Sequence, residues 1–200
     1  MANFIIWIIL GYIIGSIPWG LIIGKVFFNK DIRNYGSGNL GGTNAGRVLG
    51  APIGILVILL DALKAFLLMI VCNKFAPEVI SYCGLAVCIG HCFPIFAQFR
   101  GGKAVACSYG YFLALAIFVT HNILTFIIPV LTFFIVLIIS RWVSLGSMLG
   151  VTSASLYLLF ANTKIGFLVL LLSLFVIYRH SSNIKNIING NEPKLGKKHE

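Results

Sequence analysis

The chain has 200 residues, of which 59% are hydrophobic and only 10% are charged, and its mean hydropathy is +1.00. A soluble domain is usually about 45–50% apolar and about 25% charged, so this composition excludes an ordinary soluble domain and indicates an integral membrane protein. The net charge of +10 would indicate nucleic acid binding in a soluble protein, but in a membrane protein basic residues more often mark cytoplasmic loops, and we expect no nucleic acid partner.

Apolar runs between polar breaks predict an all-α integral membrane protein with seven transmembrane helices, because a helix needs about 20 apolar residues to cross the hydrocarbon. The first run has no basic flank and no cleavage site, so we interpret it as a retained span. Residues 1–200 are expected to form a single transmembrane domain with a short basic tail from about residue 181. The predicted spans are 4–27, 52–72, 79–97, 104–120, 123–140, 146–161 and 165–179.

The basic residues are distributed unequally between the two sets of span ends. One set carries only Lys74 and Lys164, while Lys64 lies within the second span. This asymmetry predicts an amino terminus outside and a carboxyl terminus in the cytoplasm, in a multi-pass protein of the cell inner membrane. The predicted cytoplasmic set is Lys25, Lys30, Arg33, Arg47, Arg100, Lys103, Arg141, Arg179, Lys185, Lys194, Lys197 and Lys198.

Four polar segments fall on the predicted cytoplasmic side: GSGNLGGTNAGR (36–47), FRGGKAVA (99–106), SRWVSLGS (140–147) and YRHSSNIKNIINGNEPK (178–194). Each brings at least one cation, and two bring glycine runs that leave backbone N–H groups accessible. Arginine, lysine and glycine-rich backbone are the groups that bind phosphate, and Lys103 is expected at the start of a helix, where an anion is favoured. The segments therefore predict one phosphate-binding site on the cytoplasmic face.

Two nucleotide-binding motifs are only partly matched. Gly36-x-Gly38-x-x-Gly41 matches the dinucleotide fingerprint but lacks its strand–turn–helix context. Gly102-Lys103 is not a P-loop, because alanine stands where that motif needs its first glycine and its Ser or Thr. We interpret Arg47 and Lys103 as ligand-binding residues, and Arg100 and Lys197 as residues that only set topology.

The charged and thiol groups inside the predicted spans have structural interpretations. Asp61 and Lys64 are one turn apart and predict an internal ion pair. Cys88, His91 and Cys92 cluster on one helix, but without a fourth ligand at a recognised spacing they do not predict a metal site. His91 could either orient a loop or contact a substrate.

Several segments in one order resemble the bacterial acyl-phosphate glycerol-3-phosphate acyltransferases. They are GSIPWG (15–20), GSGNLGGTNAGR (36–47), GHCFPIFAQFRGGKAVA (90–106), RWVSLGS (141–147) and RHSSNIKNIINGNEPK (179–194). The resemblance implies seven spans and a site facing the cytoplasm. It also implies acyl transfer from acyl phosphate to the first hydroxyl of glycerol 3-phosphate, giving lysophosphatidic acid and phosphate without a cofactor, as the first step of phospholipid synthesis.

Positions that match the family motifs are the expected site residues. The expected catalytic residues are Ser37, Asn39, Arg47, Lys103 and His180. The expected substrate-binding residues are Gly36, Gly38, Thr43, Asn44, His91, Gly101, Gly102, Ser144 and Asn183. The chain departs from the family pattern at Gly42, Ala104 and Cys107, which are small changes in volume that leave the cations untouched.

The His-x-x-x-x-Asp pair of the acyl-CoA-dependent enzymes is missing, because Phe96, Phe126 and Lys185 stand five positions after His91, His121 and His180. We therefore expect no acyl-enzyme and no dedicated carboxylate base; a substrate phosphate would accept the hydroxyl proton, with Ser37 or His180 as a less favoured relay. The acyl chain is expected to lie along the helices among membrane lipid. Two alternatives are a transporter of a phosphorylated solute and a non-catalytic membrane scaffold.

Overall fold

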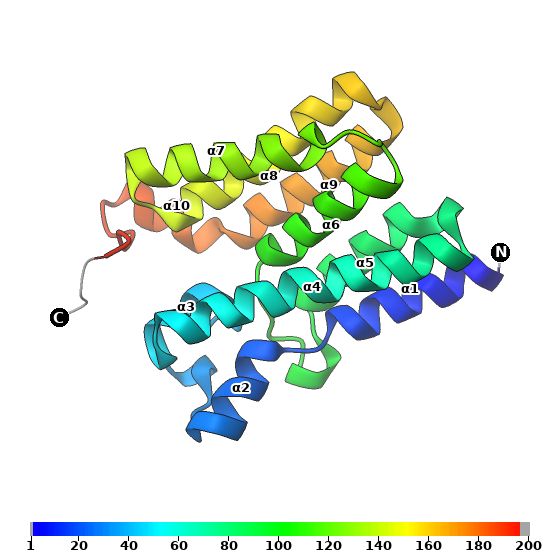
Figure 1. Ribbon diagram of the computed structural model, residues 1–200. Coiled ribbons are helices and arrows are strands. Elements are labelled where there is room, and N and C mark those ends of the chain that lie inside the picture. The colour runs from blue at the N-terminus through cyan, green and yellow to red at the C-terminus, as the bar shows by residue number, and fades with distance from the viewer. Residues whose placement is uncertain (1, 197–200) are drawn as a thin grey trace. The chain divides into compact units, whose positions relative to one another are not determined.

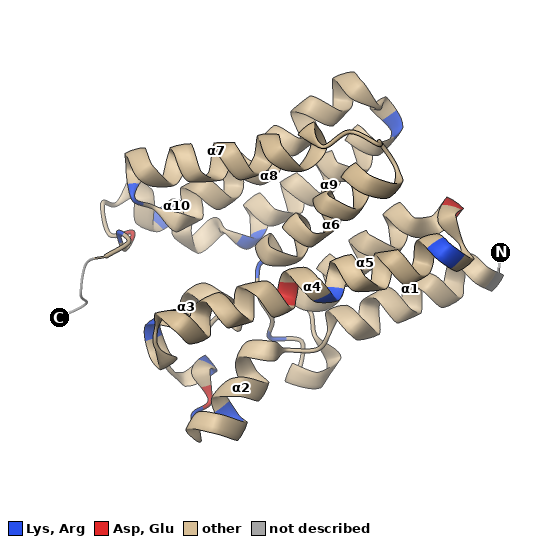
Figure 2. Cartoon of the chain, viewed as in Figure 1, with Lys and Arg blue, Asp and Glu red and all other residues tan. Residues whose placement is uncertain are grey.

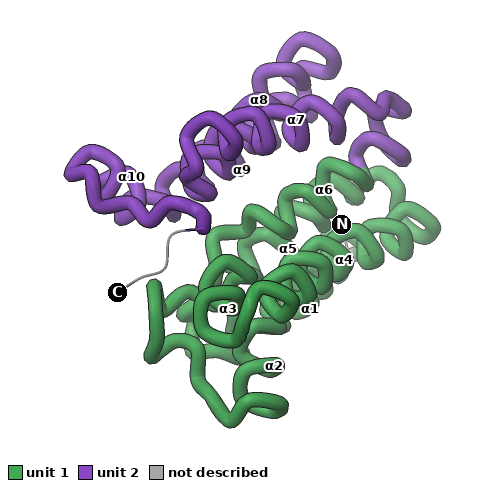
Figure 3. Tube along the Cα trace, turned by 60° about the vertical axis from the view of Figure 1, so that its left-hand side comes forward, with its two compact units in different colours: residues 1–114 green, residues 115–200 purple. Residues whose placement is uncertain are grey.

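The computed structural model describes residues 2–196, and every regular element in that range is a helix (Figure 1). Lys197 and Lys198, which were counted in the predicted cytoplasmic set, lie outside the described residues. The chain divides into two compact units, with the division after Ala114 (Figure 3). The all-helical prediction is confirmed for the described residues.

The first unit contains α1 (Ala2–Gly15), α2 (Trp19–Phe28), η1 (Ile32–Asn34), α3 (Gly42–Leu49), α4 (Ala51–Phe75), η2 (Pro77–Val79), α5 (Ile80–Cys92), η3 (Ile95–Ala97) and the start of α6 (Val105–Phe118). In this unit α1 packs against α5 and α4, and the short α3 packs against α4. Most of the length of the long helices carries no charged residue (Figure 2). The long helices therefore have the composition that a bilayer requires.

The predicted first span is two helices, since the chain leaves α1 at Gly15 and begins α2 at Trp19. Pro18 has no backbone N–H and cannot continue a helical hydrogen-bond ladder. At Gly15 a Cβ atom would lie 2.2 Å from the carbonyl oxygen of Val87, so only glycine allows α1 to approach α5 this closely. The whole stretch Asn3–Phe28 still has the length and hydropathy of one membrane span.

The second unit contains the end of α6 and then α7 (Leu124–Ser140), α8 (Val143–Ala161), α9 (Thr163–Arg179) and α10 (Ser181–Ile188). Within it α7 packs on α8 and α8 on α9, and the connections are only one or two residues long. Arg141 makes the first turn in the left-handed conformation, with φ of 62°. Because the helices are antiparallel neighbours, Arg141 and His180 lie at one end of this unit, and Asn122 and Asn162 lie at the other.

By length and composition, fewer helical stretches than the predicted seven qualify as candidate membrane spans. Among the described residues, four helical stretches are long and apolar enough to cross a membrane: Asn3–Phe28, Ala51–Phe75, Pro77–Ala97 and Val143–Ala161. Helices α9 and α10 pass the same test only when they are taken together, and they are bent by 58° relative to each other. The apolar helices α6 and α7 lie where spans were predicted but have fewer than 18 residues each. Seven spans and the orientation of the termini stay predictions.

Candidate active site

The first glycine-rich segment is held together by the side chain of Asn44, which is only 1% exposed. Its Oδ1 accepts a hydrogen bond from the backbone N–H of Ser37 at 2.9 Å. Its Nδ2 donates to the carbonyl oxygens of Ile32 at 2.9 Å and Tyr35 at 3.2 Å. Gly36 has φ of +59°, and a Cβ there would lie 2.4 Å from Asn44 Oδ1. The loop therefore closes around Asn44, and glycine is required at position 36.

Two further side chains shape the same loop. Asn39 Oδ1 accepts from the N–H of Gly41 at 2.8 Å, immediately before α3 begins. The Asp31 carboxylate accepts from the Arg33 backbone N–H at 3.1 Å and from Arg33 Nη2 at 2.6 Å, and Lys25 Nζ lies 3.5 Å away. The hydrogen bonds from Arg33 hold the pKa of the Asp31 carboxyl well below its ordinary value.

Helix α3 presents Thr43 and Arg47 to the exterior. The two residues are four positions apart, so they share one helix face, and both are exposed. Behind them α3 packs backbone to backbone on α4: a Cβ on Gly42 would lie 2.5 Å from the carbonyl oxygen of Gly54, and one on Gly54 would lie 2.6 Å from the Cα of Gly46. Close glycine packing thus supports the helix from which the Arg47 guanidinium projects.

The second glycine-rich segment folds over His91 at the end of α5. The N–H of Gly102 donates to the His91 carbonyl oxygen at 3.0 Å. A Cβ on Gly102 would lie 1.9 Å from His91 Nε2, and one on Gly101 would lie 2.2 Å from the His91 carbonyl oxygen. Lys103 follows, half-buried, two residues before α6 begins at Val105 and therefore not in the helix itself. The two glycines are needed for contact with His91.

A cluster of ionisable groups is buried behind this segment. We call Asp61, Lys64 and His91 the Asp61 cluster; their exposed fractions are 1%, 6% and 7%. The predicted ion pair between Asp61 and Lys64 is confirmed, with 2.8 Å between Nζ and Oδ1. His91 Nδ1 lies 3.3 Å from Asp61 Oδ1 and 3.2 Å from Lys64 Nζ.

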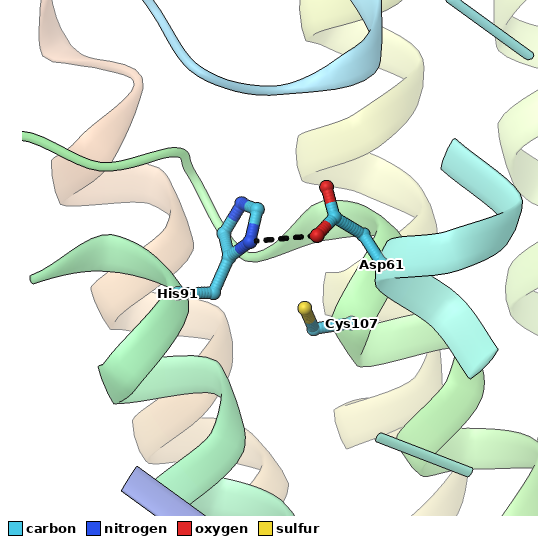
Figure 4. Close-up of side chains that lie close together, drawn as sticks. All are labelled: Asp61, His91 and Cys107. Atoms are coloured by element: carbon cyan, nitrogen blue, oxygen red, sulfur yellow. Dashed lines mark ion pairs between the residues drawn. The ribbon is translucent and has the colours of Figure 1, made fainter. Parts of the chain in front are cut away.

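Cys107 of α6 lies beside the Asp61 cluster (Figure 4). Potential ligand atoms of Asp61, His91 and Cys107 lie within 4.8 Å of one another, which is close enough for a metal ion. However, the Lys64 ammonium already stands against Asp61 and His91, where a metal cation would have to be. We therefore interpret the group as an ion-pair cluster.

In the second unit, Glu192 joins two of the expected site residues. Its Oε1 accepts from Ser144 Oγ at 2.5 Å and from Asn183 Nδ2 at 2.7 Å, and Glu192 is only 7% exposed. Sequence reasoning missed this residue; the signal was a single acidic residue in segment 178–194, whose other charged residues are Lys and Arg. Expected site residue His180 is also buried, with Nδ1 2.8 Å from the carbonyl oxygen of Val176. A carbonyl oxygen only accepts, so Nδ1 carries the proton.

The expected site residues thus form two groups in the first unit and one in the second. The first group is the 36–47 segment, with Gly36, Ser37, Gly38, Asn39, Thr43, Asn44 and Arg47. The second is His91 with Gly101, Gly102 and Lys103, and the third is Ser144, His180 and Asn183. Their roles toward substrate, and the convergence of all three groups on one ligand, stay predictions.

The apolar helices, with glycine-rich segments and buried polar clusters between and behind them, are those of an integral membrane protein. A family model described as glycerol-3-phosphate acyltransferase matches residues 5–190. The chain belongs to the glycerol-3-phosphate acyltransferase family.

Relatives cover nearly the whole chain. The glycerol-3-phosphate acyltransferase of Listeria monocytogenes is 46% identical over 198 residues, which are 96% of this chain and 97% of the relative. The enzyme of Bacillus velezensis is 47% identical over 190 residues, covering 94% and 95% of the two chains. Both relatives carry the same name as the family.

Solved structures with the same fold are also known. The crystal structure of PlsY (YgiH), described as an integral membrane glycerol 3-phosphate acyltransferase in its glycerol 3-phosphate form, superposes with a TM-score of 0.88 at 34% identity, covering 96% of each chain. Its lysophosphatidic acid form gives a TM-score of 0.84 at 33% identity, covering 96% of this chain and 95% of that one.

Proposed function

We propose that this protein transfers a fatty acyl group from acyl phosphate to the 1-hydroxyl of glycerol 3-phosphate, on the cytoplasmic face of the cell inner membrane. The products are lysophosphatidic acid and inorganic phosphate. The observation that carries the proposal is the similarity over 96% of the chain to an acyltransferase structure described as its glycerol 3-phosphate form. The proposed catalytic and binding residues are those of the three groups described above, in which His91 either orients a loop or contacts substrate.

The geometry of the glycine-rich segments supports phosphate binding. Arg47 is exposed on a short helix whose backbone is fixed against α4, so its guanidinium is presented from a rigid support. A guanidinium fork matches two phosphate oxygens at once. Lys103 directly follows two glycines, and a lysine in a glycine-rich segment is a combination that suits phosphate binding. These two cations are the proposed phosphate ligands.

The proposed reaction needs no covalent intermediate with the protein. The glycerol 3-phosphate hydroxyl oxygen attacks the carbonyl carbon of acyl phosphate, a new C–O bond forms, and the bond from that carbon to the phosphate oxygen breaks. Phosphate leaves with the electron pair, and the hydroxyl proton passes to a phosphate oxygen. Because phosphate is already a good leaving group, placement of the hydroxyl and neutralisation of the developing charge are the main contributions of the enzyme.

Glu192 is not the proposed acceptor of the hydroxyl proton. Its Oε1 already receives hydrogen bonds from Ser144 and Asn183, and Glu192 is only 7% exposed. We therefore assign Glu192 to holding those side chains, and retain a substrate phosphate as the base. Acyl phosphate is the proposed donor because the motif segments resemble those of the acyl-phosphate glycerol-3-phosphate acyltransferases, and the missing His-x-x-x-x-Asp pair agrees with that resemblance.

The test is an assay of the purified protein in lipid. With acyl phosphate and glycerol 3-phosphate we expect lysophosphatidic acid and an equal amount of phosphate, and with acyl-CoA in place of acyl phosphate we expect none. Acyl transfer from acyl-CoA alone would contradict the donor. Uptake of labelled glycerol 3-phosphate into sealed vesicles without any acyl donor would instead support a transporter.

Arg47→Ala should lower kcat/KM for glycerol 3-phosphate by about 10- to 100-fold, the loss expected for one charge-assisted contact to phosphate. Arg100→Ala is the matched control, because Arg100 is exposed and was predicted only to set topology. Initial rates over a range of glycerol 3-phosphate concentrations measure both. Equal kinetics for the two variants would remove Arg47 from the site.

A further inference from the structure

The Asp61 cluster is buried at a high energetic cost for which simple helix packing gives no reason. Its residues lie within the candidate spans Ala51–Phe75 and Pro77–Ala97, where an apolar residue would pack without any loss of hydration. Ionisable groups inside a membrane are expensive, and they usually mark a function. The contacts of the cluster indicate what that function is.

On one side, the cluster is anchored to the break between α1 and α2. Lys64 Nζ donates to the carbonyl oxygen of Ile17 at 2.9 Å. Ile17 lies just before Pro18, where the helical ladder is interrupted and carbonyl groups lose their usual partners. The ammonium therefore bonds to Ile17, Asp61 and His91 together, and fixes three parts of the first unit relative to one another.

On the other side, the cluster contacts the second glycine-rich segment through His91. Asp61 Oδ1 and Lys64 Nζ lie 3.3 and 3.2 Å from His91 Nδ1. The other ring nitrogen, Nε2, faces Gly102 so closely that a Cβ on Gly102 would lie 1.9 Å from it. The His91 carbonyl oxygen also accepts from the Gly102 N–H. A rotation of the imidazole would move Gly102, and Lys103 is the next residue.

We infer that the Asp61 cluster is a positioning device for the Gly102–Lys103 backbone, and that His91 acts on the reaction through Gly102 rather than by touching substrate. This inference rests on the proposed function only in assigning Lys103 to phosphate binding. Asp61 and Lys64 orient the imidazole, its Nε2 edge limits where Gly102 can lie, and Gly102 sets the start of the Lys103 main chain.

The two adjacent glycines allow a matched test. Gly102 does not have a positive φ, so the His91 ring is the obstacle to an alanine there. At Gly101 the obstacles are the main-chain carbonyl oxygens of His91 and Cys92, at 2.2 and 2.5 Å, and the Pro94 ring. Removal of the imidazole by His91→Ala therefore makes room for a methyl group at position 102 but not at position 101.

We expect Gly102→Ala to raise the KM for glycerol 3-phosphate at least tenfold and to lower the Tm in lipid or detergent. Addition of His91→Ala should recover at least threefold in KM and part of the Tm relative to Gly102→Ala alone. In the control pair, His91→Ala should give no recovery to Gly101→Ala. Multiplicative effects on KM and additive effects on Tm for the His91/Gly102 pair would overturn the inference.

A second set of variants tests whether the Asp61 cluster acts through Lys103, in case the alanine variants of the glycines do not fold. Lys64→Met should raise the KM for glycerol 3-phosphate at least fivefold, whereas Lys64→Arg should have a KM close to that of the unmodified protein. In a Lys103→Ala background, Lys64→Met should raise the KM by less than a further twofold. Independent effects of Lys64 and Lys103 would contradict the positioning role. A wild-type KM for Lys103→Ala alone would instead contradict the proposed phosphate site, while the Tm recovery would still report on the cluster.

Discussion

Individual polar residues in the glycine-rich segments are of two kinds that residue type alone does not separate. Asn44 and Asn39 are hydrogen-bonded to the backbone around them and hold the chain. Ser37, Thr43 and Arg47 are exposed and available to a ligand. All five were expected as site residues from their positions in the family motif; only the geometry tells which amide groups already have partners.

The Asp31 carboxylate makes a testable contribution to the stability of the folded protein. Its pKa is lowered in the folded state by Arg33, so the ionised carboxylate stabilises the fold at neutral pH. This stability is present above the ordinary aspartate value of about 3.9 and is lost as the pH falls below it toward the lower folded pKa. Asp31→Asn keeps an acceptor for the Arg33 N–H while removing the charge.

We expect Asp31→Asn to destabilise the protein by about 1 kcal/mol at pH 7, as for a partly exposed ion pair. The difference in Tm from the unmodified protein should shrink as the pH is lowered below about 4. Thermal unfolding in detergent at several pH values measures it. Glu78→Gln, at an exposed carboxylate, is the control, and a Tm difference for Asp31→Asn that does not depend on pH would contradict the ion-pair explanation.

Among the elements, the long apolar helices were predicted well and the short polar ones were not. The predicted span 52–72 corresponds to α4 (Ala51–Phe75), and 165–179 corresponds to α9 (Thr163–Arg179). Helices α3 and α10 have eight residues each and are rich in glycine or asparagine, so neither hydropathy nor helix propensity indicates them. Tertiary packing and local hydrogen bonds stabilise them instead.

Contacts between distant elements limit how much of the candidate site could be predicted from the sequence. The Asp61–Lys64 pair was predicted because helical periodicity alone brings residues three apart together. The approach of His91 to that pair, and of Glu192 to Ser144, joins positions far apart in the chain. No local pattern encodes such contacts, and for this reason the sequence indicated the glycine segments but not what supports them.

Glu192 links α8 to the segment after α10, and this link can be tested. Glu192→Ala would leave Ser144 Oγ and Asn183 Nδ2 without their acceptor, and should destabilise the protein by about 2 kcal/mol or more. Glu192→Gln retains one oxygen for both donors, so its loss should stay within about 1 kcal/mol. Thermal unfolding with Lys194→Ala as the exposed control measures both; equal losses for Ala and Gln would refute the shared-oxygen geometry.

Across the whole molecule, the uneven charge distribution predicts which ends of each unit face the cytoplasm. In the second unit, Arg141 and Lys185 are at the end where α7 meets α8 and α9 meets α10. Lys164 is the second residue of α9 and lies at the opposite end, as does Asn122 just before α7. The predicted orientation places the Asn122 and Lys164 end outside the cell.

Introduced cysteines can test this orientation, because the five native cysteines are all buried. In intact cells, a membrane-impermeant thiol reagent should label Asn122→Cys and Lys164→Cys, both at exposed positions, but not Lys185→Cys. Inverted membrane vesicles should give the reverse pattern. Labelling of Asn122→Cys and Lys185→Cys from the same side would mean that the chain between them does not cross the bilayer as predicted.

The placement of Asp61 and Lys64 on one helix also has a consequence for biosynthesis. Since the two opposite charges are one turn apart in α4, the nascent segment enters the membrane already carrying its own counter-ion. Insertion of α4 therefore does not have to wait for α5 and His91, which the ribosome makes later. Exchanging the two residues should preserve this neutral entry, whereas moving one of them to another helix would leave a lone charge at the translocon.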